Sequence, residues 1–249
     1  MTGRDPHELL VHRQSKSLGA ERDLDRALQL LRGTQGYARD PASPTATPPM
    51  LRIYRPVPTV AFGQRDARLP GFEAAASAAK SHGFEPLVRR AGGRAAAYHP
   101  GSLVVDHIEP DANAIAASRD RFVRFGQLIT DALRNCGLDA RFGPIPYEYC
   151  VGEHSVHAVS PGEQDVRIKI VGTAQRVIRT GWLFSSSIIV EDGRPIRGVL
   201  TDVYSALGLT WDPLTAGAAD ALAPGITLDA VESAVLQEYS RSQTLREAD

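Results

Sequence analysis

Short strand-like segments that follow one another with few intervening helices constrain the fold of this chain more than any other feature. The clearest is VRIKIVG (166–172), whose period-two alternation places Lys169, with Arg167 and Val171, on the face opposite its isoleucines. Further strands are predicted at residues 51–55, 59–63, 85–90, 102–108 and 181–190. Because strands and helices do not alternate strictly, the pattern favours an α+β fold, with a mixed, largely antiparallel sheet flanked by helices, over a doubly wound sheet.

Helices are predicted on both sides of these strands. They cover residues 24–31, 72–81, 114–135, 196–207 and 228–239. Asp23 is expected to cap the first helix and Asn113 the third. The apolar stripe of the third helix comprises Ile115, Phe122, Phe125, Ile129 and Leu133. Residues 41–50 contain four prolines, which exclude a helix or central strand and predict an extended connector.

The size of the chain suits one main domain. Its 249 residues are 43% hydrophobic and 23% charged, which are globular proportions. We expect residues 1–50 to form a peripheral N-terminal helix and proline-rich connector. Residues 51–249 are expected to form the main domain, with a core at about 51–207 and closing C-terminal helices within 208–245.

Charge and cysteine content exclude several classes of protein. The 28 basic and 29 acidic side chains give a net charge of −1, which disfavours a non-specific nucleic-acid binder. No run of 18 apolar residues predicts a membrane span, and the polar N-terminus lacks the apolar region of a signal peptide. Two cysteines are too few for a disulfide framework, so we expect a cytoplasmic protein with reduced thiols.

The segment RRAGGR (89–94) is the first candidate site. Gly92 and Gly93 allow positive φ and close approach of backbone N–H groups to a ligand, while Arg89, Arg90 and Arg94 supply charge for a carboxylate or phosphate. The alternative is a hairpin turn with solvated arginines. No Gly-Lys-Ser/Thr follows, so this is not a Walker loop. His99 follows shortly, and is either part of the same site or structural.

The second candidate is Cys150, which lies in the polar segment YEYCVGEHS (147–155). A thiolate at Cys150 would be a nucleophile, and nearby cations would favour the thiolate over the neutral thiol. Cys136, at the end of a predicted amphipathic helix, is interpreted as a packing residue. A zinc site at Cys150, His154 and His157 is an alternative, although the paired Cys-x-x-Cys spacing is missing.

The third candidate is the segment KIVGTAQR (169–176). A lysine on a strand is usually a solvated charge. Here Lys169 is followed by the small or polar residues Gly172, Thr173, Ala174 and Gln175, which would let a ligand approach the strand. Lys169 is therefore either a solvated charge or a side chain that points at a ligand carbonyl or phosphate.

Taken in order, RPVPTVAFGQ (55–64), RRAGGRAAAYH (89–99), YCVGEHSV (149–156) and RIKIVGTAQR (167–176) resemble the biotin/lipoate protein ligase and octanoyltransferase superfamily. The resemblance covers about residues 52–207 and is strongest to the cysteine-dependent octanoyltransferases and lipoate–protein ligases. It implies the fold of that catalytic domain. It also implies transfer of an octanoyl or lipoyl group onto a lysine of a lipoyl-domain protein, with Cys150 forming a thioester and Lys169 contacting the acyl carbonyl region.

The resemblance also assigns partners and binding residues. The donor would be an acyl carrier protein, and the acceptor a glycine-cleavage H protein or the E2 component of a 2-oxoacid dehydrogenase. The loop from Arg89 to Arg94, with His99 and residues 172–175, would bind substrate, and N–H groups near Gly172 to Ala174 would stabilise the oxyanion. Neither a metal nor a cofactor is expected for a transferase, whereas a ligase would need ATP and Mg²⁺.

The sequence departs from the family pattern in three places, and the one at Phe184 leaves the acyl group open, because that strand is expected to line the pocket. The interval from Gly92 to His99 is one residue longer than in the ligases, and Val151 replaces a small residue or proline. A Gln-His-Gly-Ser segment typical of the transferases stands here as Phe184-Ser-Ser-Ser. The alternatives are an ATP-dependent lipoate–protein ligase, for which fewer than fifty residues after Leu207 leave no room for an accessory domain, and a non-catalytic protein that binds lipoate or a lipoyl domain.

Overall fold

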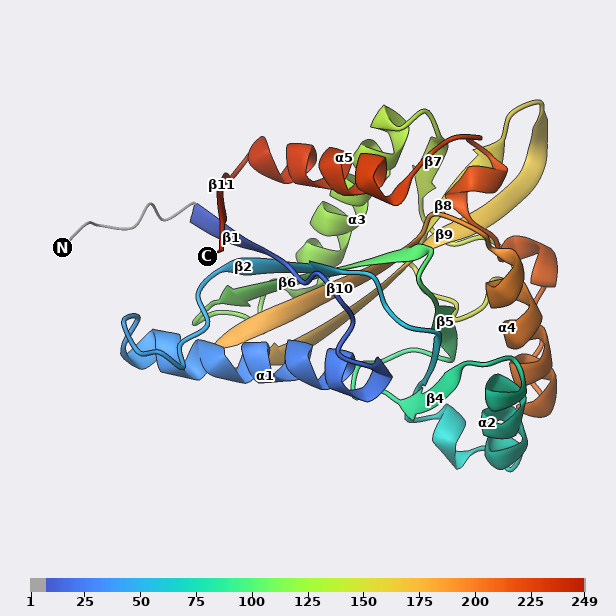
Figure 1. Ribbon diagram of the computed structural model, residues 1–249, viewed down its shortest axis with the longest axis horizontal. Coiled ribbons are helices and arrows are strands. Elements are labelled where there is room, and N and C mark those ends of the chain that lie inside the picture. Colours follow the sequence, from blue (N-terminus) through green and yellow to red (C-terminus); the bar gives the residue numbers. More distant parts are fainter. Residues whose placement is uncertain (1–7, 249) are drawn as a thin grey trace.

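The computed structural model describes residues 8–248, which form a large mixed sheet, a small sheet and the helices around them (Figure 1). The large sheet has the strand order β11-β1-β2-β6-β10-β9-β8-β7, and the small sheet the order β4-β3-β5. In the large sheet β1 is parallel to its neighbours β11 and β2, and every other pair is antiparallel. This arrangement confirms the predicted α+β class.

The strands of the large sheet are β1 (Glu8–Arg13), β2 (Met50–Tyr54), β6 (Ser102–Pro110), β7 (Asp139–Phe142), β8 (Val156–Ser160), β9 (Glu163–Ile178), β10 (Gly181–Ile189) and β11 (Thr244–Glu247). The small sheet contains β3 (Thr59–Phe62), β4 (Glu85–Val88) and β5 (Ala96–Tyr98). The α-helices are α1 (Ala20–Arg39), α2 (Phe72–Ser81), α3 (Ser118–Asn135), α4 (Arg194–Ala206) and α5 (Leu228–Ser240). Short 3-10 turns lie at Asp66–Arg68 (η1), Pro213–Thr215 (η2) and Ala219–Ala221 (η3).

The helices divide the molecule into layers around the large sheet. In Figure 1, α1 lies along one face of this sheet, where it contacts β6 and β10, while α3 and α5 pack together on the other face. The α2–α4 pair lies beside the small sheet and completes a second hydrophobic cluster there. Among residues 8–248 there is no helix with both the length and the apolarity needed to cross a bilayer.

Two predicted helices differ from the observed ones at their N-termini. Helix α3 starts at Ser118 instead of Ala114, and Ile115, which was placed in its apolar stripe, is 73% exposed in the turn before it. Helix α1 extends from Ala20 to Arg39, so Asp23 lies inside its first turns and does not cap it. In both cases apolar spacing indicated a helix correctly, but the predicted cap is not at the start of the helix: the Asp23 side chain bonds to Arg52 and Gln14, and Asn113 lies in the turn before α3.

The N-terminal segment is not peripheral. Strand β1 lies inside the large sheet between β2 and β11, so the two ends of the described chain pair side by side. Helix α1 covers the sheet face beside it. Residues 1–7 of the predicted segment lie outside the described residues. The predicted connector at residues 41–50 joins α1 to β2 and is irregular until its last residue, as its prolines require.

A buried charged cluster fastens α1 to the sheet. Arg52 on β2 is fully buried and donates to Asp23 of α1 at 2.6 Å and to Asp106 of β6 at 3.0 Å. Burial raises the pKa of Asp106 above its usual value, and Arg52 opposes that shift. Because removing either partner would leave a buried charge unpaired, this cluster fixes the position of α1 over the sheet.

Candidate active site

Cys150 lies in the loop between β7 and β8, in a conformation that side-chain-bearing residues rarely adopt. Its φ is 45°, and Tyr147 in the same loop has a φ of 59°. Left-handed backbone at residues other than glycine is costly and persists where neighbouring groups hold it. Such positions cluster at functional sites. The groups that hold this loop therefore define the site.

Lys169 is the first of these groups. Only 1% exposed, it donates from Nζ to the carbonyl oxygens of Tyr149 at 2.8 Å and Cys150 at 3.0 Å, and to Glu148 Oε1 at 3.1 Å. Glu148 in turn accepts from the Ser155 hydroxyl and from backbone N–H groups of the same loop. In this structure the ammonium group therefore holds the cysteine loop and does not bond to the sulfur. The role of Glu148 was not predicted, because only its contacts distinguish it from a solvated acid.

A β-bulge directs Lys169 toward this loop. Lys169 pairs with His157 of β8, but the next β8 residue, Val156, pairs with Val171, so β9 contains one extra residue, Ile170. A bulge of this kind reverses the facing of the residues beyond it. Lys169 therefore lines the same cavity as Gly172 and Ala174, while Val171 faces the core. The prediction that Lys169 and Val171 share a face was wrong, because simple alternation does not include the bulge.

The arginine–glycine loop contacts the cysteine sulfur from the other side. The Arg94 backbone N–H donates to Cys150 Sγ at 3.2 Å, and Arg89 Nη2 lies 3.4 Å from Sγ and also donates to Arg94 O. These donors can stabilise negative charge that develops at the sulfur or on an oxygen bound beside it. The loop is not a hairpin turn, since β3 lies between β4 and β5 in the small sheet.

Gly93 is required at the point where this loop meets the sulfur. Its φ is 107°, and an added Cβ would lie 2.4 Å from Arg89 Nη2 and 2.9 Å from Cys150 Sγ. Gly92, next to it, has open space where a Cβ would be and no positive φ. Gly93→Ala is expected to slow alkylation of Cys150 by iodoacetamide at least about tenfold, because strain of about 1–2 kcal/mol and the clash displace the loop.

Gly92→Ala is the matched control for this prediction and should keep the wild-type alkylation rate. Peptide mapping separates Cys150 from Cys136 in both variants. Equal rates for the two alanine variants would contradict the assigned role of Gly93.

Tyr204 of α4 joins the two loops. Its hydroxyl accepts from the Cys150 backbone N–H at 2.6 Å and donates to Ala95 O at 3.0 Å. Burial raises the pKa of Tyr204 well above its usual value, so the hydroxyl keeps the proton that it donates. Sequence reasoning missed this residue, because nothing in the pattern of its amphipathic helix separates it from a core tyrosine.

Tyr204→Phe is expected to lower the free energy of unfolding by about 1–3 kcal/mol, because a buried N–H and a buried carbonyl each lose a partner. It should also change the rate of Cys150 alkylation, since the two loops would no longer be held together. Tyr239→Phe, in the core on the other side of the large sheet, is the control. A destabilised Tyr204→Phe variant with an unchanged alkylation rate would show that the residue serves only packing.

A cavity of about 360 Å³ opens beside Cys150 on the α1 face of the large sheet. This volume falls in the range of small-molecule sites. Apolar side chains of α1 and the sheet form one part of its wall, including Leu24, Ala27, Leu28, Val104 and Leu183. Cys150, Lys169, Arg89, Arg90, Gly92, Gly93 and residues 172–175 also line it. Most residues predicted from separate motifs are therefore brought together around one cavity.

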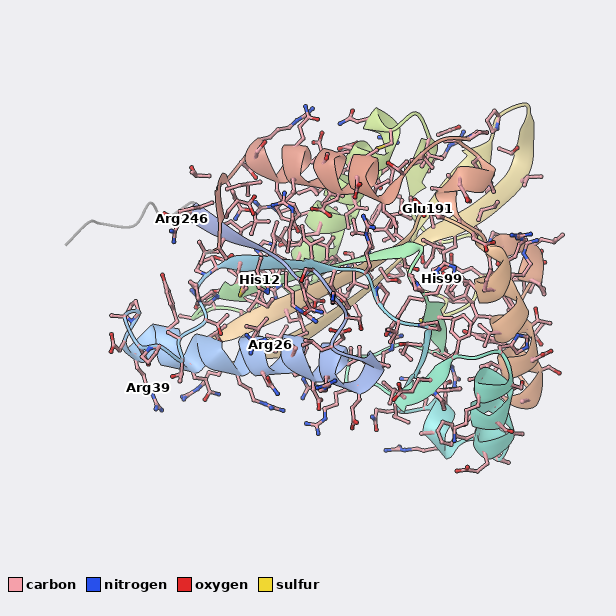
Figure 2. All side chains as sticks on the ribbon, in the orientation of Figure 1. His12, Arg26, Arg39, His99, Glu191 and Arg246 are labelled. Atoms are coloured by element: carbon pink, nitrogen blue, oxygen red, sulfur yellow. The ribbon has the colours of Figure 1, made fainter. Side chains whose placement is uncertain are left out.

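The remaining predicted residues have different surroundings. His99, labelled in Figure 2, accepts from the Gly101 N–H at Nδ1 and lies 2.8 Å from Asp192 O at Nε2. It does not line the cavity, and its assignment to the substrate site stays a prediction. Arg94 forms an ion pair with buried Asp66 at 3.0 Å. Thr173 donates to His154 O, so its hydroxyl fixes the cysteine loop.

Gln175, the last of the predicted binding residues 172–175, has a side chain whose hydrogen bonds are made within the protein. Its side chain donates to Ser118 at the start of α3 and accepts from Arg121 Nε. The donors that the structure places at the sulfur are Arg94 N–H and Arg89 Nη2, so the oxyanion role of the N–H groups of Gly172 to Ala174 stays a prediction.

The histidines near Cys150 are engaged in packing. His154 stacks on Phe122 with ring centroids 4.8 Å apart, and His157 directs Nδ1 to Gly143 O at 2.9 Å. Among the described side chains, which exclude those of residues 163–165, no group of three or more His, Cys, Asp or Glu has an arrangement that could hold a metal ion. Cys136 lies 3.8 Å from Ala230 O, and burial raises the pKa of its thiol.

Comparisons with known proteins point to the same protein family. The family model described as lipoyl protein ligase A/B catalytic domain matches residues 36–240. The chain is 26% identical over 182 residues to an octanoyl-[GcvH]:protein N-octanoyltransferase of Geobacillus kaustophilus, covering 70% of this chain and 61% of that protein. It is 27% identical over 169 residues to the protein of that name from Oceanobacillus iheyensis, covering 66% and 56%. The chain thus spans about three fifths of the length of these relatives.

Solved structures show a related fold. A bi-partite lipoate protein ligase from Thermoplasma acidophilum, determined with its E2 lipoyl domain, has a TM-score of 0.64 at 17% identity over 97% of this chain and 88% of that chain. A lipoate-protein ligase A bound with ATP has a TM-score of 0.59 at 16% identity over 99% and 90%. At these identities the likeness concerns the fold alone.

Proposed function

The chain belongs to the lipoyl protein ligase A/B catalytic-domain family, and from this premise we propose that it is an acyltransferase that acts through Cys150. It moves an octanoyl or lipoyl group onto a lysine of a lipoyl-domain protein. The observation that carries the proposal is the position of Cys150, whose sulfur meets the Arg94 N–H and Arg89 at the wall of an apolar-sided cavity. The two curated relatives, named octanoyl-[GcvH]:protein N-octanoyltransferase, support the same reaction class.

The reaction has two steps. The Cys150 thiolate attacks the carbonyl of the incoming acyl group and a new carbon–sulfur bond forms. A thioester donor then releases its thiol as a thiolate that takes up a proton, whereas an octanoylated lysine donor releases the lysine amine, which takes up a proton as the amide bond breaks. The amine of the acceptor lysine then attacks the Cys150 thioester, forms the amide, loses a proton and releases the Cys150 sulfur. A covalent intermediate divides a transfer between two large carriers into two easier steps.

The cavity holds the acyl chain during both steps. Burying a chain of eight carbons at about 0.8 kcal/mol per CH₂ supplies several kcal/mol of binding. The α1 side chains that contribute to its wall lie before the part of the chain matched by the family model, which starts at residue 36. The proposed donor is an acyl carrier protein or an octanoylated GcvH, and the acceptor is a lipoyl-domain protein such as GcvH or an E2 component.

An ATP-dependent ligase is the second candidate, favoured by the arginines near Cys150 and by the fold shared with ligase structures. Only the ligase consumes ATP, because it activates a free acid through an adenylate, whereas the transferase needs no cofactor. A non-catalytic binding protein would bind lipoate without turnover.

Intact-mass measurement after mixing the protein with octanoyl carrier protein, octanoyl-GcvH, or free octanoate with ATP and Mg²⁺ tests the proposal. The transferase is expected to gain one octanoyl group on Cys150 without ATP and to pass it to added apo-GcvH. Product that forms only with free acid and ATP would establish the ligase instead. Binding of lipoate with neither product would establish the binding protein.

A further inference from the structure

A second cavity adjoins Cys150 and has a different character from the first. Its volume is about 630 Å³. Its walls come from the turn after β3, the arginine–glycine loop, the cysteine loop, the end of β9 and the segment after α4. Cys150, Arg90 and residues 91–93 line both cavities. The cysteine therefore lies where an apolar-sided chamber meets a second chamber, which we call the arginine chamber.

The arginine chamber carries positive charge that the described residues do not neutralise. Arg65, Arg90 and Arg176 are exposed on its wall and form no ion pair with the side chains that the structure describes, which are those of residues 8–162 and 166–248. Arg94 also lines it and is neutralised by Asp66. The acidic residue among its lining side chains is Glu148, which is paired with Lys169 at 3.1 Å. The unpaired arginines thus face the chamber as free cations.

Three separate segments bring these arginines together. Arg65 follows β3, Arg90 lies in the loop after β4, and Arg176 lies on β9 beyond the last residue that pairs with β8. The convergence of three segments on a concave wall distinguishes this arrangement from scattered surface charge. Arginine binds phosphate through two parallel hydrogen bonds, and anions of this kind fit such a wall best.

We propose that the arginine chamber binds the phosphate group of the acyl donor, with the phosphopantetheine arm of a thioester donor as its source. This inference rests on the proposed transfer function and extends it to donor recognition. The acyl chain occupies the apolar-sided cavity, the thioester carbonyl lies at Cys150, and the phosphate of the arm reaches Arg65, Arg90 and Arg176. A phosphate ester attached to an acyl group could also belong to an acyl adenylate, so the experiment separates these sources.

The test compares acyl transfer from two thioesters that differ in phosphate. Octanoyl-4′-phosphopantetheine and octanoyl-pantetheine are mixed separately with wild-type protein and with the double variant Arg65→Gln/Arg176→Gln, and the rate of acyl-Cys150 formation is followed by intact mass. The variant is expected to lose about tenfold or more of the rate with the phosphorylated donor, because charge-assisted hydrogen bonds are removed. Its rate with octanoyl-pantetheine should stay within about twofold of wild type. Arg179→Gln, an exposed arginine that lines neither cavity, is the control.

A second measurement does not depend on turnover. Phosphopantetheine, but not pantetheine, should protect Cys150 of the wild-type protein from iodoacetamide, and the double variant should lose this protection. Equal rate losses with both donors, or equal protection by both compounds, would overturn the proposal. If no thioester acylates Cys150 and the variant instead loses adenylate formation from octanoate and ATP, the phosphate is that of an adenylate, and the transferase function and the pantetheine source are both wrong.

Discussion

Cys150→Ser is expected to form no stable acyl-enzyme and to lose octanoyl transfer by about 10³-fold or more, the range seen when a covalent nucleophile is removed. Serine nearly preserves the size of the side chain but replaces a thiol, which ionises readily, with a weakly acidic hydroxyl. The donors placed at the sulfur, Arg94 N–H at 3.2 Å and Arg89 at 3.4 Å, remain available to substrate in this variant. The measurement is intact mass for the intermediate and amide product on apo-GcvH for the overall reaction.

Cys136→Ser is the matched control, because the chain has two cysteines and this one packs against α5 away from both cavities. It should retain wild-type transfer and acylation. Undiminished transfer by Cys150→Ser would contradict the covalent mechanism. If that transfer then required ATP, the ligase alternative would replace it.

The family and fold could be predicted from the sequence because they depend on patterns that are local in the chain. The strands at residues 102–108 and 181–190 and the helix at 72–81 were predicted within about two residues. Elements that depend on distant pairing were missed, such as β1 and β11, which stabilise each other from opposite ends of the chain. Short or polar strands acquire their structure from neighbours, so propensity alone does not reveal them.

The candidate site shows the same division. The motifs around Cys150, Lys169 and Gly93 were found because glycine, cysteine and lysine stand out in a local pattern. Tyr204 and the bulge at Ile170 were missed, since a hydroxyl that joins two loops and one extra strand residue leave no local signal. His99 shows the opposite case, because its position near a motif predicted a substrate contact while backbone groups engage both of its ring nitrogens.

Lys169→Met is expected to lower the free energy of unfolding by about 3–5 kcal/mol, the usual cost of removing one partner of a buried ion pair. Methionine approximates the shape of lysine but leaves the Glu148 carboxylate, whose side chain is fully buried, without its cation. The carbonyls of Tyr149 and Cys150 lose the same donor. Urea unfolding measures the loss.

Comparing Lys169→Met and Glu148→Gln, singly and combined, separates the contribution of the pair to stability from its role in catalysis. Lys169→Met/Glu148→Gln removes the stranded charge and should therefore be more stable than Lys169→Met alone. Acyl-Cys150 formation should stay abolished in both variants, because neither can hold the cysteine loop by its carbonyls and keep the φ of Cys150 at 45°. Recovery of acylation together with stability in the double variant would show that Lys169 acts only through the ion pair. We expect stability to return while acylation does not. That result would show that the ammonium group positions the loop that carries the nucleophile.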